Sequence, residues 1–258
     1  MKQREVNIRE LSEFLLDYII SLLMAGANTE RAVRGTLRIA NSFGYEVTIA
    51  ILQTNIMMTI YDPDSDYTRT FVRHQNVPKI NFNLVSELSS LSWYVLDNHM
   101  SLEEAKKRYN EILVSKTISW PVMWISVSIV NIFWCKLFNG DIGSMIIVFV
   151  ATVLSVLVRE ICIRFKLDAR LTYVLVSFTA SFIALMLSQT GISETVDVAL
   201  YTSVLFLTPG VLIINSVTDI LDGHILTGFA RGIYAFIILI CIALGLYSTI
   251  MIQQVCDL

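Results

Sequence analysis

Residues 196–231 read VDVALYTSVLFLTPGVLIINSVTDILDGHILTGFAR, an apolar segment with Pro209-Gly210 near its middle and two aspartates beyond that pair. Its first part, 196–218, is long enough to cross a bilayer, which takes about 20 helical residues. Proline has no backbone N–H, so Pro209 removes the helical partner of the Leu205 carbonyl, and Gly210 loosens the next turn. Transporters place such broken helices where freed backbone groups meet substrate or ions. A plain proline kink is the alternative interpretation of the pair taken alone.

The polar residues after the break share one helix face. Asn215, Asp219 and Asp222 follow the spacing i, i+4, i+7, which puts their side chains on the same side of a helix. An acidic group near the membrane interior is costly unless it is used, so Asp219 is the candidate to carry a proton, counter a cation or pair with Arg231. Asp222 is interfacial in this interpretation, and Arg231 could instead hold an anionic group. We therefore expect this face to line a substrate or ion route.

A short connection follows this face. Gly223, His224 and Gly228 favour a flexible turn before the next apolar stretch. His224 can titrate near neutral pH, although a single loop histidine is more often only solvated. We include His224 among the candidate site residues because of its position.

The composition around this segment is that of a membrane domain. The 258 residues are 55% hydrophobic and 16% charged, whereas soluble domains are about 25% charged. Residues 1–117 hold 13 Lys/Arg and 14 Asp/Glu, but residues 118–258 hold only 6 and 8. Five apolar stretches follow, at about 118–138, 142–163, 171–190, 196–218 and 229–252. We therefore predict an α-helical integral membrane protein with about five transmembrane helices in residues 118–258.

Basic residues alternate from one connection to the next. They lie before the first stretch (Lys106, Lys107, Arg108, Lys116) and between the second and third (Arg159, Arg164, Lys166, Arg170). The connection between the third and fourth has acids but no base, and Lys136 is the one base on the wrong side. The positive-inside rule then puts the N-terminal domain in the cytoplasm and the C-terminus outside. Arg159 is either such a topology signal or the partner of Glu160. A net charge of −3 without a basic run excludes a nucleic-acid binder.

Residues 1–117 have the pattern of a small cytoplasmic α+β domain. Apolar periodicity predicts helices at 11–25, from Asn28 or Thr29 to about 43, at 82–98 and at 102–114, the last with a Ser101–Glu104 capping box. Residues 46–61 read as one or two strands, and 55–74 as a hairpin. Alternating aspartates at 62–66 resemble the start of a calcium loop, but a solvated turn is favoured.

The chemistry-bearing motifs of common enzymes do not occur. HExxH, GxSxG and P-loop patterns are missing from the sequence, so we predict no enzymatic activity, no cofactor and no metal. The four cysteines lack CxxC or Cys/His spacing and are expected to be small hydrophobic side chains.

Three spaced patterns resemble a known family, the threonine/serine exporters (ThrE type). The first is Pro209-Gly210-x4-Asn215-x3-Asp219-x3-Gly223-His224-x3-Gly228-x2-Arg231, which closely resembles the family signature. The others are Gly26-Ala27-x-Thr29-x-Arg31, similar to an early GAxTxR element, and Lys136-Leu137-Phe138-x-Gly140. The resemblance covers nearly the whole chain.

This resemblance implies a subunit rather than a complete transporter. Full-length members have a cytoplasmic domain and about ten spans, so the chain resembles the larger, YjjP-type subunit of the two-component branch, which is completed by a small YjjB-type membrane protein. Homo-oligomers with paired half-cavities are the alternative. The resemblance implies export of threonine and serine, or of succinate-like dicarboxylates, driven by an ion gradient.

The favoured hypothesis is a subunit of a secondary transporter in the cytoplasmic (inner) membrane. Its candidate substrate-binding, ion-binding or gating residues are Pro209, Gly210, Asn215, Asp219, Arg231, His224, Lys136 and Arg159. The alternative is a membrane-anchored metabolite sensor or regulator whose cytoplasmic domain binds a ligand. A membrane-embedded hydrolase using Asp219 and Asp222 is disfavoured, because facing carboxylates usually come from separate elements.

Overall fold

The computed structural model describes residues 7–52, 55–63, 67–74, 80–114 and 119–256. It divides into two compact units. The sheet-containing unit comprises Met1–Lys116 and Gly210–Ile233, and the helical unit comprises Thr117–Pro209 and Tyr234–Leu258. Gly210–Ile233, which hydropathy alone assigns to the membrane domain, thus groups with the N-terminal part of the chain by its contacts.

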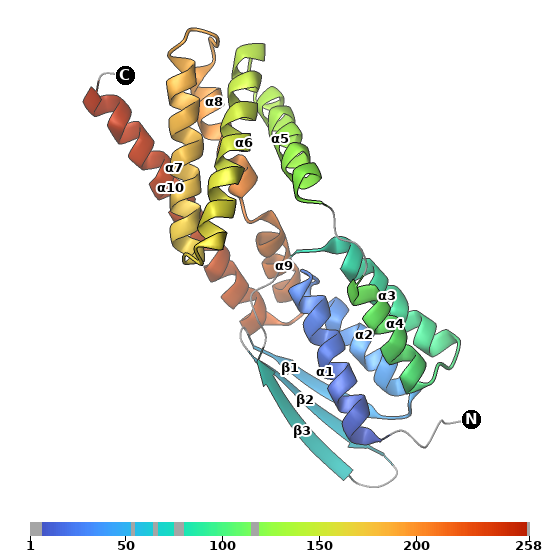
Figure 1. The fold of residues 1–258 in the computed structure, drawn as a ribbon. Coiled ribbons are helices and arrows are strands. Elements are labelled where there is room, and N and C mark those ends of the chain that lie inside the picture. The colour runs from blue at the N-terminus through green and yellow to red at the C-terminus, as the bar shows by residue number, and fades with distance from the viewer. Residues whose placement is uncertain (1–6, 53–54, 64–66, 75–79, 115–118, 257–258) are drawn as a thin grey trace. The chain divides into compact units, whose positions relative to one another are not determined.

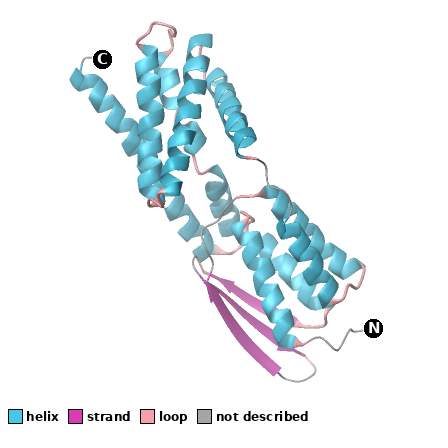
Figure 2. Ribbon diagram, viewed as in Figure 1, coloured by secondary structure: helices cyan, strands magenta, loops and turns pink. Residues whose placement is uncertain are grey.

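The sheet-containing unit combines helices with one small antiparallel sheet (Figures 1 and 2). Its N-terminal elements are α1 (Ile8–Met24), α2 (Thr29–Ser42), β1 (Glu46–Ile51), β2 (Asn55–Asp62), β3 (Tyr67–His74), α3 (Phe82–Asp97) and α4 (Leu102–Val114). Its C-terminal elements are α9 (Gly210–Leu221) and the first part of α10 (Ile225–Cys256). The strand order is β1-β2-β3, and α1 contacts β2 while α2 contacts β1.

The core of this unit draws on all four N-terminal helices and on β1 and β2, and the contact between α1 and β2 forms one part of it. Ile56, Met58 and Ile60 alternate along β2 and are fully buried, whereas Met57 between them is 40% exposed. This period of two is what a strand with one covered face requires. The apolar residues of α1 repeat at helical spacing and cover that face, as the sequence pattern predicted.

Several local predictions for this unit are confirmed. The 55–74 hairpin pairs Asn55 with His74 and Asp62 with Tyr67, although residues 64–66 of its expected turn lie outside the described residues. The capping box is present, since Ser101 Oγ donates to Glu104 and accepts from the Glu104 N–H at 3.3 Å. These signals are local, so the sequence could carry them.

The helical unit contains α5 (Trp120–Leu137), α6 (Ile142–Arg164), α7 (Ala169–Ser188), α8 (Val196–Thr202), the 3₁₀ turn η1 (Leu205–Leu207) and the rest of α10 (Figure 1). Small and hydroxyl side chains hold its helices together. Ser177 Oγ donates to the Ile242 carbonyl at 2.7 Å, and Ser181 and Thr249 hydroxyls lie 2.7 Å apart. A Cβ on Gly245 would lie 2.5 Å from the Val174 carbonyl oxygen, so glycine permits the close approach of α7 and α10. Such contacts are typical of helix packing in membranes.

One aspartate organises the end of α6. Asp141 caps α6 by accepting the Ser144 N–H at 2.7 Å, and it also accepts the Glu194 N–H at 2.8 Å. Hydroxyls of Ser193 and Thr195 donate to the same carboxylate. These hydrogen bonds, the Glu194 N–H first, hold the pKa of Asp141 well below its ordinary value. The connection between α7 and α8 is therefore tied to the start of α6.

Four helices in the described part of the chain are long and apolar enough to cross a membrane. They are Trp120–Leu137, Ile142–Arg164, Ala169–Ser188 and Ile225–Val255. A bent pair, Val196–Leu207 with Gly210–Leu221, passes the same test together and would make a fifth crossing if counted as one. The described part of the chain is thus mostly helical, with four or five candidate membrane spans and a small N-terminal sheet, and the count of five crossings stays a prediction.

Three details of the prediction change. Gly228 lies inside α10, which begins at Ile225 rather than at 229, so the turn before it is shorter than expected. The Leu205 carbonyl is not left open by Pro209, because it accepts the Thr208 N–H at 3.0 Å in the 3₁₀ turn. Glu160 pairs with Arg164 at 3.7 Å rather than with its neighbour Arg159.

Candidate functional site

The α9–α10 hairpin gives the glycines of the C-terminal pattern a structural role. Gly223 ends α9 with φ +89°, a conformation that favours glycine, and the His224 N–H returns to the Asp219 carbonyl at 2.7 Å. A Cβ on Gly228 would lie 2.7 Å from the Ser216 carbonyl oxygen, closer than real contacts allow. Ser216 Oγ instead donates to the Gly228 carbonyl at 2.6 Å. The two helices can therefore pack backbone to backbone.

The turn between α1 and α2 carries the early element of the sequence. Gly26 has φ +97° after the end of α1, and the Ala27 N–H closes the turn on the Leu22 carbonyl at 3.1 Å. The Asn28 side chain caps α2 by accepting the Arg31 N–H at 3.3 Å. The first N–H of α2, that of Thr29, is left for another partner.

The two elements, nearly 190 residues apart, meet in one buried polar cluster within the sheet-containing unit. Asn215 Nδ2 donates to the Gly26 carbonyl at 2.9 Å, and the Thr29 N–H donates to Asp219 Oδ1 at 2.8 Å. Arg231 Nη1 donates to Asp219 Oδ2 at 2.6 Å. The side chain of Asp219 is 0% exposed and that of Arg231 16% exposed. The structure therefore forms the Asp219–Arg231 ion pair that the sequence analysis considered.

This cluster balances its charge and places it where it is favourable. A carboxylate at a helix N-terminus is stabilised by the helix dipole, and Asp219 takes that position for α2. Its second oxygen is occupied by Arg231, so the buried negative charge is fully partnered. Removing either partner of such a pair leaves the other charge buried alone, which destabilises a fold strongly. We define this group, Gly26, Thr29, Asn215, Asp219 and Arg231, as the joint cluster.

A second group of contacts flanks the joint cluster. His224 Nε2 lies 3.2 Å from Glu30 Oε2, and Thr227 Oγ1 donates to the Ile51 carbonyl at 2.7 Å. Glu30 also accepts from Arg34, and this hydrogen bond, followed by that of His224, lowers the Glu30 pKa. His224 is therefore tied to α2 and is not merely solvated.

The remaining predicted residues lie outside the joint cluster. Pro209 and Gly210 mark the break between η1 and α9, and Gly210 has open space around it. Lys136 and Arg159 are exposed in the helical unit, and neither forms an ion pair with a described residue. The pattern around Lys136 closes α5, since the Gly140 N–H bonds the Cys135 carbonyl at 2.9 Å.

Sequence reasoning missed the partners that come from the backbone. The Gly26 carbonyl and the Thr29 N–H have no signature of their own, because every residue has such groups. Thr29 Oγ1 is also buried without a hydrogen-bond partner among the described residues, which leaves one polar atom unsatisfied beside Asp219. The Gly26-Ala27-x-Thr29-x-Arg31 pattern marked this turn as a candidate, but nothing in the pattern indicated contact with the C-terminal pattern.

The described residues contain no group of three or more His, Cys, Asp or Glu side chains placed to hold a metal ion. What the joint cluster offers is a buried carboxylate, a guanidinium and the N-terminus of α2. These groups suit a change of ion pairing rather than covalent catalysis.

Comparison with known proteins identifies the family of the chain. The family model described as "Putative threonine/serine exporter" matches residues 13–253, a range that includes both halves of the joint cluster. The chain belongs to the threonine/serine exporter family. Membership of an exporter family implies a transport protein rather than an enzyme.

Two curated relatives span almost the same length. A protein of Klebsiella aerogenes named "Probable succinate transporter subunit YjjP" is 26% identical over 243 residues, with 92% of each chain covered. A protein of the same name from Escherichia coli K12 is 25% identical over 246 residues, with 95% of each chain covered. No solved structure matches the chain. The exporter family member described here therefore resembles proteins named as transporter subunits.

Proposed function

We propose that this chain is one subunit of a secondary transporter that exports a small hydrophilic metabolite across the cytoplasmic membrane. Succinate-like dicarboxylates and threonine or serine are the substrate classes, and an ion gradient supplies the energy. The observation that carries the proposal is the joint cluster, in which the two family elements share one buried, charge-balanced contact. The names of the two relatives support a dicarboxylate.

In this proposal the Asp219–Arg231 pair is the element that changes during transport. Protonation of Asp219 would remove the charge that Arg231 neutralises and would weaken the hold on the α2 N-terminus. The pair therefore has two states that a proton can select between. Asn215 contacts the substrate or holds the turn at Gly26, and Pro209-Gly210 allows the broken segment to move. His224, Lys136 and Arg159 remain candidates for gating or for attracting an anion.

The proposed setting follows the distribution of basic residues. The N-terminal domain, residues 1–117, lies in the cytoplasm, five segments cross the membrane, and the C-terminus is outside. A small YjjB-type membrane subunit completes the route, since five crossings make about half of a repeat-built transporter. A second copy of this chain is the alternative partner.

Export from cells tests the proposal. Cells that lack endogenous exporters would express this chain alone, a small YjjB-type membrane protein alone, or both. The release of labelled succinate, threonine and serine would be followed. Release that needs both chains and collapses with an uncoupler supports a two-component secondary transporter. The proposal is contradicted if cells with both chains release no more substrate than cells with one chain or with neither.

A membrane-anchored metabolite sensor is the second candidate. An arginine-lined cavity in the sheet-containing unit favours it, because a sensor needs a ligand site of its own. The sensor hypothesis predicts ligand binding without flux in proteoliposomes that contain both subunits, whereas the transporter predicts flux.

A further inference from the structure

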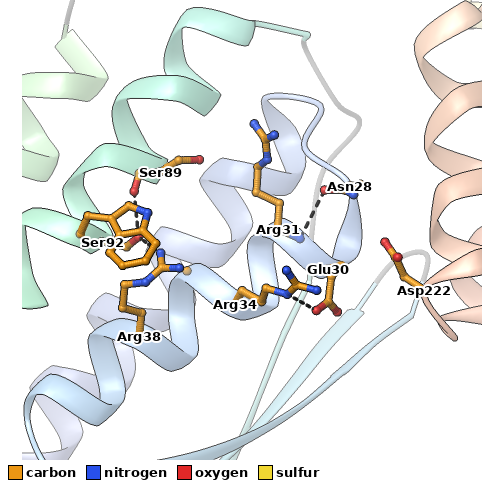
Figure 3. Close-up of a pocket in the computed structure, with 10 residues that line it drawn as sticks. Asn28, Glu30, Arg31, Arg34, Arg38, Ser89, Ser92 and Asp222 are labelled. Carbon is orange, nitrogen blue, oxygen red and sulfur yellow. Dashed lines mark hydrogen bonds and ion pairs between the residues drawn. The ribbon is translucent and has the colours of Figure 1, made fainter.

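Helix α2 carries three arginines on one face, and they border a cavity that the joint cluster does not use. Arg31, Arg34 and Arg38 follow the spacing i, i+3, i+7, which places them along one side of the helix. The cavity has a volume of about 500 Å³, within the range of small-molecule sites, about 300–1,000 Å³. All of its lining residues belong to the sheet-containing unit, and they come from α2 with its cap Asn28, from α3 and from Asp222 in the turn after α9 (Figure 3).

Arg38 is held in place before any ligand arrives. Its Nη1 donates to Ser92 Oγ at 2.6 Å, and its guanidinium lies 3.5 Å from the centre of the Trp93 ring. Ser92 is fully buried, and its hydroxyl proton is already donated to the Ser89 carbonyl at 2.8 Å. A guanidinium fixed by a buried hydroxyl and an aromatic face loses little freedom on binding an anion. Arg38 therefore forms a preorganised end of the cavity.

Arg31 provides a second guanidinium that is open to a ligand. Its side chain is exposed and makes no hydrogen bond or ion pair with any described residue, whereas Arg34 is neutralised by Glu30. Figure 3 shows Arg31 and Arg38 at separate positions along α2, with Arg34 turned toward Glu30. The backbone positions of Arg31 and Arg38 are two helical turns apart, roughly 10 Å along the axis. This spacing suits two carboxylates of one short molecule better than a single anionic group.

The wall formed by α3 adds no charge, and one unpaired acid borders the cavity beyond it. α3 contributes Ser92 and Trp93, which are neutral, and the unpaired acid is Asp222 in the turn directly after α9, which has no ion pair with a described residue. Glu30 links the cavity to the α9–α10 turn, because it contacts Arg34 and also His224 at 3.2 Å. A ligand bound to the arginines is therefore connected to that turn through Glu30.

We propose that this cavity is a binding site for a small dicarboxylate, with Arg31 and Arg38 each taking one carboxylate. The choice of carboxylate over phosphate rests on the proposed transport function, while the existence of an anion site rests on the arginines and the cavity. Arginine's planar fork binds carboxylates through paired N–H groups, which gives both strength and orientation. The site is separate from the joint cluster and lets the protein bind its substrate on the sheet-containing unit.

Calorimetric titration of the full chain in lipid nanodiscs tests the proposal, with succinate as the probe. Threonine and inorganic phosphate serve as comparison ligands. The informative variants are Arg31→Ala, Arg31→Lys and Arg38→Ala, and Arg69→Ala on β3 is the matched control because it lies outside the cavity lining. The exposed Arg31 side chain makes no hydrogen bond or ion pair with a described residue, so its variants should fold even if Arg38→Ala does not.

We expect saturable succinate binding that weakens at least about tenfold in Arg31→Ala and Arg38→Ala and is unchanged in Arg69→Ala. Arg31→Lys should recover only part of the affinity, because lysine keeps the charge but not the fork. The proposal is overturned if succinate does not bind, if binding survives Arg31→Ala, or if threonine or phosphate binds as tightly.

The titration needs neither the partner nor an ion gradient. Loss of export with intact succinate binding would therefore refute the proposed function and leave this site standing. Intact export without binding would refute the site alone.

Discussion

Replacing Asp219 by alanine should release the start of α2 from the α9–α10 hairpin. The substitution removes the acceptor of the Thr29 N–H, 2.8 Å away, and the partner of Arg231, 2.6 Å away. Loss of a helix-terminal acceptor costs about 1 kcal/mol. Leaving one partner of a buried ion pair alone costs about 3–5 kcal/mol, and the lower end applies because the Arg231 side chain is still 16% exposed. The local free energy of opening should therefore fall by roughly 3–4 kcal/mol.

Hydrogen exchange of the Thr29 amide measures this opening directly, because that N–H bonds Asp219 itself. A loss of roughly 3–4 kcal/mol corresponds to exchange about 100- to 1,000-fold faster, since 1.4 kcal/mol is a factor of ten. Mass spectrometry of the segment that contains Thr29, on the full chain in detergent micelles, provides the rate. Asp222→Asn is the matched control, because Asp222 is exposed in the turn directly after the same helix and forms no ion pair with a described residue.

A second substitution separates the ion pair from general damage. Adding Arg231→Met to Asp219→Ala removes the unpaired cation, so the double variant should regain more than half of the lost protection. Exchange at Thr29 within threefold of wild type in Asp219→Ala would refute the reasoning. So would a double variant that is no better protected than the single one.

Three further predictions concern stability. Gly228→Ala should lower the free energy of unfolding by about 1–3 kcal/mol, because its Cβ would lie 2.7 Å from the Ser216 carbonyl oxygen. Gly210→Ala should be neutral or slightly stabilising in thermal unfolding, because nothing lies within 4 Å of its Cβ position. Asp141→Asn should lower the melting temperature at pH 7. Because the pKa of Asp141 is depressed in the folded state, the difference in melting temperature should persist above about pH 4 and vanish as the pH falls further. Thr152→Val should destabilise the helical unit by about 1 kcal/mol, since it removes the 2.8 Å partner of buried Asn131, and Asn131→Leu in addition should restore part of that loss.

The N-terminal elements could be predicted from the sequence because their signals are local. Alternation along β2, the capping residue Asn28 and the Ser101–Glu104 box each act within a few residues. The helix ends of this region consequently fall within a few residues of the predicted positions. The apolar helices α5, α6 and α7 were predictable for the same reason, since length and hydropathy are properties of a single segment.

The grouping of α9 with the N-terminal elements could not be predicted. Hydropathy assigns 210–218 to a membrane crossing, but its polar face meets the α1–α2 turn through a backbone carbonyl and a backbone N–H. The spacing of Asn215 and Asp219 predicted that they share a helix face. Nothing in the sequence indicated that the α1–α2 turn would contact this face. The sequence pattern placed Gly228 in a loop because glycine disfavours helices. In the structure it lies inside α10, where close packing against α9 leaves no room for a Cβ.

Flux through proteoliposomes that contain this chain and its small partner tests the central claim, that the Asp219–Arg231 pair acts in transport. Labelled succinate, threonine and serine would be loaded inside, and efflux would be measured under an imposed proton gradient. Asp219→Asn is expected to reduce efflux of the transported substrate at least about tenfold, and Asp197→Asn, an exposed acid on α8, should leave it unchanged. Equal efflux from wild type and Asp219→Asn for every substrate would contradict the account.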